Sequence, residues 1–169
     1  MINTLRSAAG AVSLIGAGLV LAQDRAPADT TLRIGGDVPA SVTLTLSDLA
    51  AMAHETAIVT AENGTKSGYR GVPLREILAR AGAPFGKDLR GKNMTTYVLA
   101  SAHDGYQVVF TLAELDAAFG NQNILVADTH EGKPMAAPLG PLRIVCVGDK
   151  AGARSLRMLE TLEVVRVRK

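Results

Sequence analysis

The sequence predicts an α+β domain of about eight short strands interleaved with three or four short helices. Short runs rich in β-branched residues recur along the chain, and turn-forming residues separate them. Apolar residues at helical spacing occur only in brief segments between those runs. The chain has 169 residues and no internal repeat, which favours a single domain.

The first 22 residues have the pattern of an export signal. Arg6 supplies a positive charge, and an uncharged, mostly apolar stretch follows it and ends at Val20-Leu21-Ala22 with a small residue suited to cleavage. This stretch of roughly 15 residues is shorter than the roughly 20 that a membrane span needs. We therefore expect cleavage, no stable membrane insertion afterwards, and a periplasmic or secreted protein. An uncleaved anchor is the alternative.

Residues 23–30 are polar and contain a proline, so they are expected to form a flexible leader to a single domain over residues 31–169. Residues 31–34 and 41–46 are the first two predicted strands, because apolar residues alternate with threonines in the second run. Ser47 is expected to cap a short helix that ends at about Ala53.

A hairpin and a helix are predicted next. The runs 56–61 and 66–70 flank Asn63-Gly64, a pair typical of tight hairpin turns. Pro73 is expected at the first position of a helix that ends at Gly82. Its apolar residues follow helical spacing: Leu74, Ile77, Leu78 and Ala81.

The second half of the chain alternates strands with short helical segments. Runs 95–100 and 106–110 are predicted strands, and Thr111 with Glu114 forms a capping-box pattern that begins a helix to about Phe119. The remaining predicted elements are a strand at 124–127, a turn at 131–134, a strand at 142–147, a helical turn at 155–158 and a strand at 163–168.

The one cysteine, Cys146, lies inside the apolar run 142–147. A single cysteine excludes an intramolecular disulfide, a Cys-x-x-Cys metal site and covalent haem attachment through Cys-x-x-Cys-His. Because apolar surroundings raise a thiol pKa, Cys146 is expected to be a buried and unreactive core residue.

Composition excludes several classes of function. The formal net charge is only +2, and the chain has three Tyr, three Phe and no Trp, so nucleic-acid binding is not expected. The common nucleotide-binding, hydrolase and zinc-protease motifs are absent. His54, His103 and His130 are far apart in sequence, and no metal site is expected from them.

Two segments carry groups suited to binding an anion. A turn at Asp104-Gly105 places Tyr106 at the start of a strand beside His103, where a phenol and an imidazole could hydrogen-bond a ligand. A glycine-rich loop from Gly148 leads to Arg154, Ser155 and Arg157, which suits an oxyanion or phosphate. A tyrosine at the edge of the core and an ordinary surface loop are the alternatives.

The order of these segments resembles the molybdopterin-binding domain of the sulfite oxidase family. The resemblance covers roughly residues 31–167. It rests on Arg70-Gly-Val-Pro-Leu-Arg-Glu-Ile-Leu78, Tyr106-Gln-Val-Val-Phe-Thr-Leu-Ala-Glu-Leu115, Glu131-Gly-Lys-Pro-Met135, Gly140-Pro-Leu-Arg-Ile-Val145 and Gly152-Ala-Arg-Ser-Leu-Arg-Met-Leu159. It implies that family's mixed-sheet α+β fold and makes molybdopterin a possible cofactor.

The resemblance also locates a difference. The family's metal-binding cysteine lies in the loop before the helix that matches residues 74–81, and the corresponding segment here, residues 58–64, contains no cysteine. Tyr106 matches the family's active-site tyrosine, and Arg154 matches an arginine of its pterin-contacting loop. Arg157 and Met158 stand where lysine and tryptophan are usual.

We therefore expect an exported domain of this fold that lacks molybdenum redox catalysis and binds a small anionic ligand or an exported partner protein. The expected binding residues are Tyr106, His103, Arg154, Ser155 and Arg157, and no catalytic residue is expected. Two alternatives stay open. One is a genuine molybdopterin-dependent oxidoreductase with a non-cysteine metal site, and the other is a module that only contacts proteins.

Overall fold

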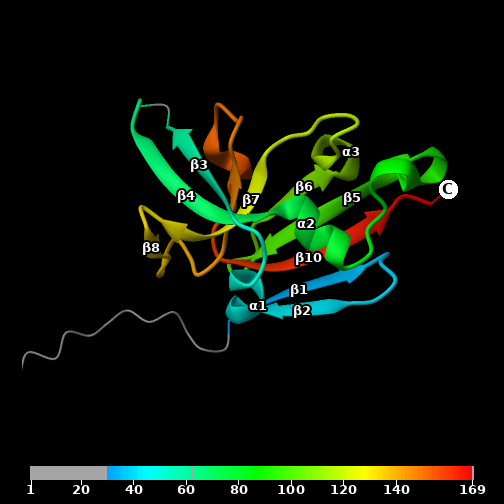
Figure 1. Ribbon diagram of the computed structural model, residues 1–169, viewed down its shortest axis with the longest axis horizontal. Coiled ribbons are helices and arrows are strands. Elements are labelled where there is room, and N and C mark those ends of the chain that lie inside the picture. Colours follow the sequence, from blue (N-terminus) through cyan, green and yellow to red (C-terminus); the bar gives the residue numbers. More distant parts are fainter. Residues whose placement is uncertain (1–29, 62, 169) are drawn as a thin grey trace, which may run out of the picture.

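The computed structural model describes residues 30–61 and 63–168 (Figure 1). The predicted export signal and residues 23–29 of the predicted leader lie outside the described residues. Within the described part, no helix has both the length and the hydropathy needed to cross a membrane.

The first sheet places the start and the end of the domain side by side (Figure 1). Its spatial order is β2 (Val42–Thr45), β1 (Thr31–Gly36), β10 (Leu159–Arg166), β5 (Thr96–Ala102) and β6 (Gln107–Thr111). β1 and β10 run parallel, whereas the other neighbouring pairs are antiparallel. The sheet is therefore mixed, and its central strand is the last strand of the chain.

The second sheet carries the predicted hairpin. Its members are β3 (Glu55–Thr60), β4 (Lys66–Pro73), β7 (Ile124–His130), β8 (Lys133–Pro134) and β9 (Arg143–Cys146). All its pairings are antiparallel, and β8 and β9 both pair with β7. At the β3–β4 turn, the Thr65 amide donates to Asn63 Oδ1, and Gly64 has a φ of 81°. The hairpin prediction at Asn63-Gly64 is confirmed.

Three α-helices and three 3-10 turns connect these strands in the described residues. They are α1 (Leu46–Ala50), α2 (Leu74–Arg80), α3 (Leu112–Leu115), η1 (Gly86–Asp88), η2 (Gly91–Thr95) and η3 (Gly152–Arg154). The α2 side chains of Leu74, Ile77 and Leu78 are fully buried in a core to which both sheets contribute. A smaller core on the second sheet contains Ala57, Tyr69, Leu125, Ala127, Met135 and Val145. The predicted α+β class is confirmed.

Three predicted helix boundaries are wrong. Pro73, predicted at the first helical position, is the N-cap of α2, which begins at Leu74. The other two differ because side chains bind the backbone at other positions. Thr45, not Ser47, caps α1: its Oγ1 accepts from the Asp48 amide at 3.1 Å, and the Asp48 carboxylate accepts from the Thr45 amide at 2.8 Å. Thr111 caps α3 as predicted, but that helix ends at Leu115 and does not reach Phe119. Asp116 turns extended there, since its carboxylate accepts from the Gly86 amide at 2.6 Å.

The helical turn predicted at residues 155–158 is also wrong. The turn forms earlier, at η3, and residues 156–159 pass beside β9, with Met158 at a φ of 51°. The Ile144 amide donates to the Leu156 carbonyl at 2.8 Å, and the Leu159 amide donates to the Leu142 carbonyl at 3.0 Å. Pairing with β9 satisfies these backbone groups, so a helical turn would leave the Ile144 amide without a partner.

Candidate functional site

A cavity of about 420 Å³ opens between the β3–β4 hairpin and the loop that follows β9. The hairpin contributes one wall through Val59, Thr60, Ala61, Asn63, Ser67 and Tyr69. β9 and the following loop contribute the other through Arg143, Val145, Cys146, Asp149, Lys150, Ala151, Gly152 and Ser155. We call this cavity the hairpin pocket.

Tyr69 and Arg143, which line the hairpin pocket, form a stack with the imidazole of His130. The Tyr69 ring stacks on the His130 ring with centroids 4.7 Å apart, and the Arg143 guanidinium lies 5.4 Å from the Tyr69 centroid. Arg143 Nη1 donates to the Tyr69 hydroxyl at 3.2 Å. Arg143 Nε is buried and has no hydrogen-bond partner, so the guanidinium keeps an unused donor.

A second cation of the pocket, Lys150, is exposed and has no partner among the described residues. The neighbouring carboxylate of Asp149 does not neutralise it, because Arg154 Nε and Nη2 hold both Asp149 oxygens at 2.8 Å. That pairing lowers the pKa of Asp149. The pocket therefore offers Arg143 and Lys150 to an anion, with its one carboxylate already paired.

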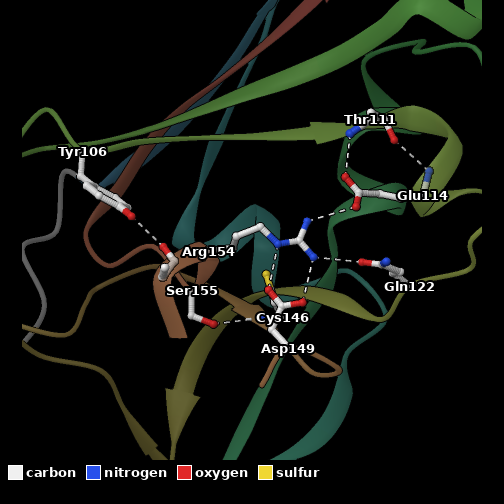
Figure 2. Close-up of polar contacts among 9 residues, drawn as sticks. Tyr106, Thr111, Glu114, Gln122, Cys146, Asp149, Arg154 and Ser155 are labelled. Atoms are coloured by element: carbon white, nitrogen blue, oxygen red, sulfur yellow. Dashed lines mark hydrogen bonds and ion pairs between the residues drawn. The ribbon is translucent and has the colours of Figure 1, made fainter. Parts of the chain in front are cut away.

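Arg154 is the centre of a polar network that spans three segments of the chain (Figure 2). Besides Asp149, its Nη1 contacts Glu114 Oε2 at 3.1 Å and its Nη2 contacts Gln122 Oε1 at 3.2 Å. The guanidinium also lies over the Phe110 ring, 5.3 Å from the centroid. Hydrogen bonds to the two carboxylates raise the pKa of Arg154 further above its ordinary value.

This network uses four of the five N–H donors of the guanidinium. Arg154 therefore ties the loop after β9 to α3 and to the segment before β7. In this arrangement the Arg154 side chain positions the loop after β9. The predicted contact of Arg154 with a ligand stays a prediction.

Two more of the predicted binding residues lie at the same loop. The Tyr106 hydroxyl donates to the Ala153 carbonyl at 2.9 Å, and its side chain is 49% exposed (Figure 2). Ser155 Oγ accepts from the Cys146 amide at 3.2 Å, and Ser155 lines the hairpin pocket. The structure thus brings Tyr106, Arg154 and Ser155 together, although they come from two distant parts of the sequence.

The other two predicted residues lie elsewhere. His103 lines a different cavity of about 300 Å³, where its Nδ1 lies 2.7 Å from Glu160 Oε1. The hydrogen bond to Glu160 raises the pKa of His103. Arg157 is exposed and pairs through its backbone with Arg143. Neither side chain lines the hairpin pocket.

Cys146 is buried in the main core at 2% exposure, which confirms the sequence prediction, and it also lines the hairpin pocket. Burial raises the pKa of its thiol to about 12, so the group is protonated at neutral pH. Among the described residues, no group of three His, Cys, Asp or Glu side chains is arranged to hold a metal ion.

Sequence reasoning missed Arg143, Lys150 and Tyr69. A signal for Arg143 was present, because it interrupts an apolar strand two positions before Val145, and alternate residues of a strand share a face. Val145 lies in the smaller core and lines the pocket, so Arg143 points to the same side. Tyr69 carried no comparable signal, because its place opposite Arg143 depends on the pairing of β4 and β9 with β7.

Comparisons with known proteins agree on the fold. A family model described as the oxidoreductase molybdopterin binding domain matches residues 19–169. A chain in the crystal structure of the sulfane dehydrogenase SoxCD from Paracoccus pantotrophus has a similar fold, with a TM-score of 0.62 and 20% sequence identity. The match covers 81% of this chain and 38% of that chain, so this chain spans well under half of its structural neighbour. No curated protein matches the sequence.

Proposed function

We propose that this chain, which belongs to the oxidoreductase molybdopterin binding domain family, binds a small anionic ligand in its hairpin pocket and carries out no molybdenum redox catalysis. The observation that carries the proposal is the pair of uncompensated cations, Arg143 and Lys150, in one pocket. A volume of about 420 Å³ also lies within the range of small-molecule sites, roughly 300–1,000 Å³.

The shape of the ligand follows from the stack beside Arg143. The Tyr69 ring and the apolar side chains of Val59 and Val145 favour a flat or partly apolar body, while the two cations favour a phosphate or carboxylate attached to it. A pterin phosphate fits this description. So do a nucleotide and an aromatic carboxylate.

The donor set of the pocket does not suit molybdenum. Thiolates are the soft ligands that would hold such a metal, and the side chains of the hairpin wall offer oxygen donors instead, from Thr60, Asn63, Ser67 and Tyr69. The thiol of Cys146 is held protonated by burial, with the Asp149 carboxylate raising its pKa further. The proposal therefore assigns no redox step to this chain.

A thermal-shift screen tests ligand binding, with inorganic phosphate, reduced and oxidised pterin phosphates and nucleotides as probes. A ligand at a hundred times its Kd adds about 2.7 kcal/mol of stability. We expect this stabilisation in the natural protein and its loss in Arg143→Gln and Lys150→Gln. The matched control is Lys133→Gln. Lys133 is exposed, does not line the hairpin pocket, and has no side-chain hydrogen bond or ion pair among the described residues.

Two outcomes would contradict the proposal and identify the alternatives. Stoichiometric molybdenum in protein purified from a cofactor-competent host would make the chain an oxidoreductase with a non-cysteine metal site. No shift with any probe, together with unchanged behaviour of the Arg143 and Lys150 variants, would favour a module that contacts a partner protein.

We also propose that the protein acts outside the cytoplasm, on the export-signal pattern of residues 1–22. Amino-terminal sequencing of protein recovered from a periplasmic or culture fraction should give a start near Gln23. Protein that stays in the cytoplasm with an intact start would contradict this.

A further inference from the structure

The end of β10 lies beside the turns that precede β5 (Figure 1). These segments are rich in basic residues. Their cationic residues are Lys87, Arg90, Lys92, Arg166 and Arg168. The same two segments carry two exposed apolar residues, Met94 at 39% and Val167 at 58% exposure. We call these segments the basic edge.

Hydrogen bonds hold the two segments of the basic edge together. The Val167 amide donates to the Thr95 carbonyl at 3.3 Å, and Thr95 Oγ1 donates to the Val167 carbonyl at 3.3 Å. Arg166 Nη1 donates to Asn93 Oδ1 at 3.4 Å. Residues 93–95 and 166–167 are therefore neighbours in space, and Met94 and Val167 lie at adjoining backbone positions.

The positive charge of the basic edge is only partly compensated. Asp37 binds the Arg168 guanidinium and accepts from the Arg166 amide at 2.9 Å, which lowers the pKa of Asp37. Asp88 is the other carboxylate of these segments. Lys87, Arg90 and Lys92 are exposed, and none of the three has a side-chain partner among the described residues.

The excess of positive charge at the basic edge is local. The whole chain carries a formal net charge of only +2, so an excess of cations at one edge must be balanced by acidic residues elsewhere on the surface. Attraction to an anionic surface would then orient the molecule with this edge inward, because exposed charges act only over about a Debye length, roughly 8 Å at physiological salt.

We propose that the basic edge docks the domain on an anionic lipid surface. The cations would lie against headgroup phosphates, and Met94 and Val167 would enter the interface between headgroups. The exposed apolar side chains of the same segments favour lipid over a single-stranded nucleic acid, whose bases stack on aromatic side chains that this edge lacks in its described residues. The proposal does not depend on the ligand of the hairpin pocket.

Vesicle sedimentation tests the proposal, with vesicles of phosphatidylglycerol in phosphatidylcholine against phosphatidylcholine alone. The whole chain is used, and mass spectrometry establishes its length so that every variant has the same amino terminus. We expect binding to the anionic vesicles only, with affinity falling as salt rises. Each basic side chain near a lipid surface contributes about fivefold in affinity, so Arg90→Gln with Lys92→Gln should weaken binding roughly 30-fold.

The matched control is Lys66→Gln with Lys133→Gln, which removes the same charge from exposed positions on the second sheet. Equal weakening by both double variants would overturn the proposal, because only net charge would then matter. Binding that ignores lipid charge and salt would also overturn it. Binding of the protein to DNA or to an acidic peptide, at protein concentrations that give no binding to the anionic vesicles, would overturn it as well. Val167→Ser should weaken vesicle binding without changing its salt dependence.

Discussion

The thiol of Cys146 lies at the boundary between the main core and the hairpin pocket. Because burial raises its pKa to about 12, the thiolate is scarce at any physiological pH. We expect labelling by a disulfide reagent at pH 8 to be slow in the native protein and fast in guanidinium chloride. Fast labelling of the native protein would mean that the pocket opens to the thiol.

Arg154 should contribute more to the free energy of unfolding than its neighbour Arg157. Arg154→Ala removes four charge-assisted hydrogen bonds and leaves the carboxylates of Asp149 and Glu114 without the cation that both of them bind. Because the guanidinium is about one-third exposed, we expect a loss of roughly 1–3 kcal/mol in the free energy of unfolding by urea. Arg157→Ala, its exposed neighbour, should change that value by less than about 0.5 kcal/mol.

His103 should give the protein a pH dependence at its second cavity. The hydrogen bond to Glu160 raises the pKa of His103 above its ordinary value of 6.5. A raised pKa means that the folded state binds the proton more tightly, so the pair stabilises the fold fully below pH 6.5 and loses this effect as pH rises through the folded pKa.

An NMR titration of the His103 ring measures this shift directly. In Glu160→Gln the pKa of His103 should fall back toward 6.5, because the carboxylate that favours the imidazolium is gone. An unchanged titration in that variant would show that Glu160 is not the cause.

Among the strands, the β4–β7 pairing depends on a glycine. A Cβ at Gly71 would lie 2.3 Å from the Val126 carbonyl oxygen and 2.4 Å from the Ala127 Cα, at the place where the strand register shifts. Gly71→Ala should therefore lower the free energy of unfolding by about 3 kcal/mol, since the backbone of β7 must move. The control is Gly148→Ala, where an added Cβ meets no atom within 4 Å. Equal stability of the two variants in urea would contradict this account.

For the whole molecule, the last strand closes the fold. β10 lies between β1 and β5, and its buried residues Leu159, Leu162 and Val164 belong to the main core. A chain that stops at Met158 should show no cooperative urea transition, because two strands lose their shared neighbour. Removal of residues 167–169 alone should keep the transition and weaken binding to anionic vesicles. A cooperative transition in the shorter chain would contradict the central role of β10.

Local chemistry let the sequence predict most elements of this fold. The Asn63-Gly64 turn, the Thr111 cap and the helical spacing of Leu74, Ile77 and Leu78 act between residues close in the chain, and the structure confirms each of them. The wrong boundaries occur where distant groups compete. Asp116 ends α3 by binding the Gly86 amide, and hydrogen bonds to β9 hold residues 156–159 beside that strand instead of in a helical turn.

The sequence by itself determined the α+β class, the family pattern and the burial of Cys146, because composition and periodicity are local properties. Only the tertiary structure decided which groups face the hairpin pocket. It placed Tyr69 and Arg143 together through the pairing of β4 and β9 with β7, and it put His103 at a different cavity. It also paired Arg154 with Asp149 and Glu114. Carboxylates that the fold holds 2.8 and 3.1 Å from a guanidinium satisfy its donors before any ligand binds.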